Sequence, residues 1–70
     1  MKPGDLVKST SDWFLYEEHD GMFQSDIKFM TNEIGVILES KIYDVTTTWQ
    51  KLLTPSGIGW AQDSWLRRVE

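Results

Sequence analysis

The sequence of 70 residues has no cysteine, one histidine and only two prolines. Without cysteine the chain can form neither disulfides nor thiolate zinc sites, and it has no cysteine nucleophile. Cations are also scarce, since seven lysines and arginines stand against eleven aspartates and glutamates, a formal net charge of −4. A surface that grips nucleic acid needs clustered Lys and Arg, so this balance disfavours nucleic acid as a partner.

Long hydrophobic runs are absent as well. No uncharged stretch approaches the ~18 apolar residues of a membrane span, and residues 1–5 lack the apolar region of a secretory leader. Hydrophobic residues make up 40% of the chain and charged residues 26%, which is typical of a globular domain. We therefore expect one soluble intracellular domain over residues 1–70, with no membrane partner.

Turn-forming residues divide the chain into short segments rich in strand-forming residues. The expected strands cover residues 5–10, 34–40, 42–54, 58–61 and 66–69, and residues 62–65 suit one turn of 3-10 helix. Residues 11–32 follow neither a helical nor a strand period, which predicts a long structured loop after the first strand. Five short strands around one core predict an all-β barrel.

One of these strands has an unusual pattern. Residues 34–38, Ile-Gly-Val-Ile-Leu, form a continuous apolar run rather than an alternation of apolar and polar residues. A strand that is half exposed alternates, whereas a strand covered on both sides is apolar throughout. The run therefore predicts that this strand is buried on both faces.

The C-terminal residues 59–66, Gly-Trp-Ala-Gln-Asp-Ser-Trp-Leu, followed by Val69, resemble the closing segment of SH3 and bacterial SH3-like domains. In that pattern the glycine, here Gly59, lets the backbone approach closely, and a 3-10 turn precedes the last strand. Residues 4–7 and 34–38 look like the first two strands of small SH3-like barrels, including KOW-type modules. The overall order resembles small SH3-like proteins of tailed bacteriophages.

This resemblance implies a small five-stranded SH3-like barrel and a location in the cytoplasm of a bacterial host. It does not extend to the peptide-binding groove of SH3 domains. That groove has a proline and an asparagine in the closing turn, where this chain has Gln62 and Ser64. The Ala-Leu-Tyr-Asp-Tyr-like opening strand of that groove is also missing.

Candidate catalytic groups are few. Residues 17–20, Glu-Glu-His-Asp, contain metal-ligating types, but consecutive side chains project in different directions, which favours a solvated acidic loop over a metal site. The hydroxyls of residues 9–11 and 46–48 have no accompanying base, elbow or phosphate-binding motif. We expect no enzyme activity, no metal and no cofactor.

The four tryptophans are the most distinctive feature. Each ring carries on the order of 200 Å² of surface, so a small core can bury about two of them, and Trp60 is the expected core member. We predict a partly exposed patch that binds a protein or peptide. Its residues are Trp13, Phe14, Tyr16 and Trp65. Alternatively, the loop that bears three of them folds down as a lid over the barrel, and self-association through the patch would satisfy both interpretations.

These observations favour a non-enzymatic interaction module, a small accessory protein of a phage or bacterium. Acidic residues of the loop (Glu17, Glu18 and Asp20) would bias it toward basic partners. The alternative is a KOW-type nucleic-acid-binding barrel. In that case Lys51, Arg67 and Arg68 would contact phosphates while Trp49 and Trp60 stack on bases.

Overall fold

The computed structural model describes residues 1–18 and 21–69, with Met22 by its backbone. The described chain is all-β, with seven strands, one 3-10 helix and no α-helix. The elements are β1 (Leu6–Ser9), β2 (Trp13–Glu18), β3 (Met22–Phe29), β4 (Ile34–Ile42), β5 (Thr48–Thr54), β6 (Gly57–Gln62), η1 (Asp63–Trp65) and β7 (Leu66–Arg68).

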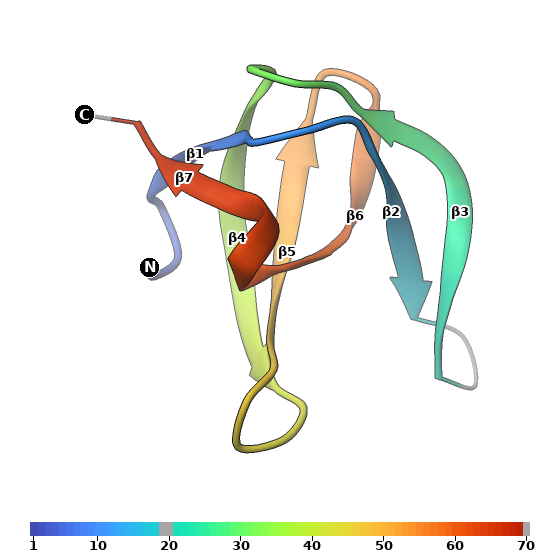
Figure 1. Cartoon of the computed structure of the whole chain (residues 1–70), viewed down its shortest axis with the longest axis vertical. Helices are drawn as coiled ribbons and strands as arrows, with labels where there is room; N and C mark the ends of the chain where they lie inside the picture. Colours follow the sequence, from blue (N-terminus) through green and yellow to red (C-terminus); the bar gives the residue numbers. More distant parts are fainter. Residues whose placement is uncertain (19–20, 70) are drawn as a thin grey trace.

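All seven strands belong to one sheet, in the order β3-β2-β6-β5-β4-β1-β7, and every pair of neighbours is antiparallel. The sheet curls around its core, with the β2–β3 hairpin on one side and β1 and β7 crossing β4 on the other (Figure 1). The all-β prediction is therefore confirmed, and so is the 3-10 turn before the last strand.

The predicted number of strands was wrong, because the segment expected to be a loop contains two paired strands, β2 (Trp13–Glu18) and β3 (Met22–Phe29). A register shift between Phe14 and Tyr16 interrupts this hairpin. Such a bulge breaks the two-residue alternation by which a strand is recognised in sequence. At the bulge, Ser25 Oγ donates to the Leu15 carbonyl and accepts from the Ile27 N–H, at 2.9 and 3.1 Å.

Each strand supplies one side chain to the hydrophobic core, and all seven are at most 7% exposed. These residues are Val7, Leu15, Phe29, Ile37, Leu52, Ala61 and Leu66, in strand order. Trp60 is also buried, at 5% exposed. It lies on the opposite face of β6 from Ala61, however, so it covers the outside of the sheet and is not part of this cluster.

The prediction that β4 is buried on both faces was wrong for this chain. Gly35 and Ile37 point into the core, whereas Ile34 and Leu38 are 41% and 42% exposed. None of the described elements covers the outer side of this strand.

The close approach expected at Gly59 is present. A Cβ atom on Gly59 would lie 2.7 Å from the Leu15 Cβ and 3.3 Å from the Tyr16 carbonyl oxygen, so β2 crosses this position against bare backbone. Leu15 is fully buried and cannot retreat without opening the core.

We predict that Gly59→Ala lowers the free energy of unfolding by about 1–3 kcal/mol, because overpacking forces backbone shifts. Gly35→Ala is the matched control, since the nearest atoms to its added Cβ would be the Thr54 methyl at 3.3 Å and the Leu53 carbonyl oxygen at 3.4 Å, with no contact as short as the one at Gly59. Urea unfolding followed by tryptophan fluorescence measures both variants. Equal losses for the two variants would contradict the close approach at Gly59.

Candidate functional site

Four aromatic rings from β2, β5 and η1 form one contiguous group, which we call the aromatic cluster. Its members are Trp13, Tyr16, Trp49 and Trp65. Trp13 stacks on Trp65 with ring centroids 4.5 Å apart and planes 10° apart. Trp49 meets Tyr16 edge-on at 5.2 Å and Trp65 at 5.7 Å, and Tyr16 lies 6.0 Å from Trp65. These separations lie in the range of favourable aromatic pairs.

Backbone and side-chain hydrogen bonds fix the strands that carry these rings. The Thr10 N–H and hydroxyl both donate to the Trp65 carbonyl, at 3.1 and 3.0 Å. One residue before Trp13, the Asp12 carboxylate accepts from the N–H and the hydroxyl of Thr31, both at 2.8 Å. These hydrogen bonds fix the backbone at Trp65 and next to Trp13.

One ring of the cluster is buried, and the others are partly exposed to solvent. Trp49 is 7% exposed, whereas Trp13 and Trp65 are half-buried. Trp65 packs against the hydrophobic core. The Trp13 indole N–H is buried and has no acceptor among the described residues.

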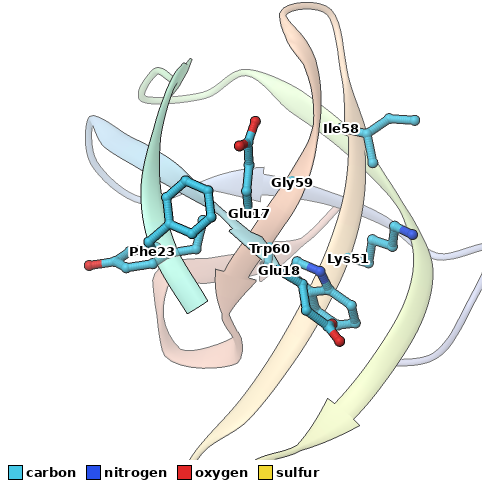
Figure 2. A pocket seen from close by; sticks show the side chains of 8 residues that line it. Glu17, Glu18, Phe23, Lys51, Ile58, Gly59 and Trp60 are labelled. Carbon is cyan, nitrogen blue, oxygen red and sulfur yellow. The ribbon is translucent and has the colours of Figure 1, made fainter. Parts of the chain in front are cut away.

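Two hollows open on either side of Tyr16, which lines both. The first, of about 550 Å³, lies between the β2–β3 hairpin and β6, and Figure 2 shows Phe23 and Glu17 on one side of it and Lys51 on the other. Its lining residues are Tyr16, Glu17, Glu18, Phe23, Lys51, Ile58, Gly59 and Trp60. The second, of about 320 Å³, is lined by Tyr16, Tyr43, Asp44, Thr47, Trp49 and Gln62.

Carboxylates border both hollows. In the first, Glu18 pairs with Lys41 at 3.2 Å, and the Lys51 ammonium lies 6.0 Å from the centre of the Trp60 ring. In the second, Asp44 accepts from the Thr46 N–H at 2.8 Å and its hydroxyl at 2.9 Å. These hydrogen bonds to the ionised form lower the pKa of Asp44, which therefore stays charged.

The structure brings together three of the four residues predicted for the patch: Trp13, Tyr16 and Trp65. Phe14 lies outside the cluster, with the Lys28 ammonium 5.5 Å from its ring centre. Sequence reasoning missed Trp49. It lies inside the strand expected over residues 42–54 and belongs only to the nucleic-acid alternative, and nothing in the sequence shows which rings it meets.

The cations of the nucleic-acid alternative are not adjacent in the sheet. Lys51 lies on β5 in the first hollow, whereas Arg67 and Arg68 lie on β7, separated from β5 by β4 and β1 in the sheet. Arg67 is directly opposite Lys8, and Arg68 is 3.9 Å from the Asp5 carboxylate.

Of the acidic stretch 17–20, Glu17 and Glu18 border the first hollow, and His19 and Asp20 lie outside the described residues. Within residues 1–18 and 21–69, no three His, Cys, Asp or Glu side chains are grouped as metal ligands. The same residues contain no helix long and apolar enough to span a membrane.

Comparison with protein-family models, curated proteins and solved structures found no match to this chain.

The hydrogen bonds at Asp12 and Asp44 predict an acid-dependent loss of stability. Bonds from threonine lower the pKa of both carboxyls below the ordinary value of 3.8. They therefore stabilise the fold above pH 3.8, and this contribution disappears as the pH falls through the lowered values. Thermal unfolding between about pH 6 and pH 2 measures this loss.

Asp12→Asn and Asp44→Asn should each give a smaller drop in melting temperature on acidification than the unmodified chain. Asp26→Asn, at an exposed position of β3, is the control for removing one negative charge. If both variants follow the acid profile of the unmodified chain, the two carboxylates do not contribute in the way described.

Proposed function

We propose that the protein is a non-enzymatic SH3-like interaction module that binds another protein or peptide across the aromatic cluster. The observation that carries the proposal is the convergence of Trp13, Tyr16, Trp49 and Trp65, from three separate elements, between two hollows. Binding hot spots are enriched in large aromatic side chains, and binding sites are usually concave.

The order of elements supports the SH3-like part of the proposal. A short first strand is followed by a long excursion, three antiparallel strands, a 3-10 turn and a last strand that pairs with the first. The sequence pattern of residues 59–66 resembles the closing segment of SH3-like domains, and the 3-10 helix lies within it. We also propose, on this resemblance, a phage or bacterial accessory protein that acts in the host cytoplasm.

The rigidity of the cluster favours binding. Binding costs the entropy of ordering side chains, and rings that already pack on one another have little left to lose. Trp49 and Trp65 are held by the sheet and the core, while Trp13 and Trp65 remain partly exposed. A partner can therefore gain apolar contact without first organising the site.

The charges around the hollows specify the kind of partner. Glu17 and Glu18 border one hollow, which Lys51 also lines, and Asp44 borders the other, so a segment lying across Tyr16 meets carboxylates at both ends. Complementary charge speeds association and rejects wrong partners more than it adds affinity. We expect the partner to present Lys or Arg on either side of an apolar segment.

The test is capture of the partner from the native or infected host, followed by titration with the purified partner. Trp13→Ser and Tyr43→Ser should each weaken binding at least about tenfold, or ~1.4 kcal/mol. Tyr43 is 67% exposed, so this variant leaves the fold intact even if Trp13→Ser destabilises it.

Phe14→Ser is the matched control, because it removes a ring from the same strand but outside the cluster. It should bind like the unmodified chain. Undiminished binding by folded Trp13→Ser and Tyr43→Ser would refute the proposed surface. Labelled oligonucleotides at low salt are the counter-test, and tight, salt-sensitive binding would favour the nucleic-acid alternative.

A further inference from the structure

A row of aliphatic side chains crosses the outer face of the sheet. Its members stand directly opposite one another on four adjacent strands, Leu6 against Val36, Val36 against Leu53, and Leu53 against Ile58. We call them the aliphatic row. Leu6, Leu53 and Ile58 are 47%, 46% and 48% exposed, and Val36 between them is half-buried.

The exposed patch extends beyond the row. Along β4, Ile34 and Leu38 flank Val36 and are 41% and 42% exposed. At the β1 end, the Val69 N–H donates to the Leu6 carbonyl at 2.9 Å, and the Val69 side chain is 36% exposed. Single exposed aliphatic residues are ordinary, but a contiguous patch marks an interface.

The sequence of β4 matches a strand covered on both faces, as its continuous apolar run predicts. Within the described chain, only the side of Gly35 and Ile37 is covered. The core covers one face of β4. An additional layer against the outer face would bury the remaining apolar side chains of this strand.

Opposite charges stand at the two ends of the aliphatic row. Beyond Leu6, β7 brings Arg67 directly against Lys8 on β1. Beyond Ile58, β2 brings Glu17 and Glu18 to the hollow that Ile58 also lines. Lys51 lines this hollow too and Lys41 pairs with Glu18, so Glu17 is the carboxylate that the charge test uses. Like charges opposite each other on neighbouring strands are unfavourable. A carboxylate placed near Lys8 and Arg67 would therefore reduce the repulsion between them.

We propose that a second copy of this chain covers the aliphatic row, in a two-fold dimer that packs sheet against sheet. A two-fold axis parallel to the strands, between β4 and β5, places Leu6 over Ile58 of the second copy and Val36 over Leu53 of the second copy. The same rotation sets the basic end of each row against the acidic end of the other. A surface of this kind is self-complementary, as an isologous interface requires.

The row and the aromatic cluster share no residue, but Ile58, Glu17 and Glu18 line the first hollow together with Tyr16, so the two proposals meet at that hollow and are tested by different variants. The row crosses a curled sheet, so two such surfaces meet over a limited area and the dimer should be weak. Sedimentation equilibrium from about 10 µM to about 1 mM should show a concentration-dependent shift from one chain mass to two. A single chain mass throughout that range would overturn the proposal.

Leu53→Lys, at the centre of the row, should abolish the shift and leave the fold intact, because the side chain is 46% exposed. Ile58→Lys is a second variant with the same expectation. Val45→Lys is the matched control, since Val45 is fully exposed in the 43–47 turn, outside the row. Circular dichroism melting confirms that each variant is folded.

The charge arrangement is tested separately. Arg67→Glu should weaken dimerisation at least about fivefold, and the double variant Arg67→Glu with Glu17→Arg should restore part of the loss. Self-association that survives Leu53→Lys and Ile58→Lys would show that another surface is used, and would overturn the proposal.

Discussion

The β2–β3 hairpin is joined to the rest of the sheet by one register pair, Tyr16 opposite Trp60, and this junction exists because Gly59 has no side chain. Leu15 fills the space that a Cβ would occupy and so enters the core. On the other face of the same strand, Tyr16 is turned toward Trp49 and Trp65. One missing side chain thus positions a core residue on one side and a candidate binding residue on the other.

The order of the elements after residue 33 could be predicted because those strands follow simple rules. The apolar run of β4, the turn at residues 55–57 and the Gly-Trp segment each have a local signature. The hairpin could not be predicted, since its bulge disrupts the alternation near Leu15 and four aromatic or aliphatic residues follow one another. A tertiary contact, with Gly59, decides which of them turns inward.

The aromatic cluster was predicted in part for a similar reason. Exposed rings on the 11–32 segment and at Trp65 suggested a patch, and three of the four expected residues do meet. Trp49 meets Tyr16 from a strand more than 30 residues later in the chain, a juxtaposition that the pairing of β6 with both β2 and β5 creates. Phe14 departs from them because neighbouring side chains on a strand project to opposite faces.

The bulge at Ser25 affects how copies of the molecule can assemble. β3 lies at the edge of the sheet, and its irregular stretch breaks the even spacing of N–H and C=O groups that an incoming strand would need. Edge-to-edge addition, the route to open-ended fibres, is thereby discouraged. Contact through the sheet face, by contrast, ends once two molecules have met, so the geometry favours closed assemblies over polymers.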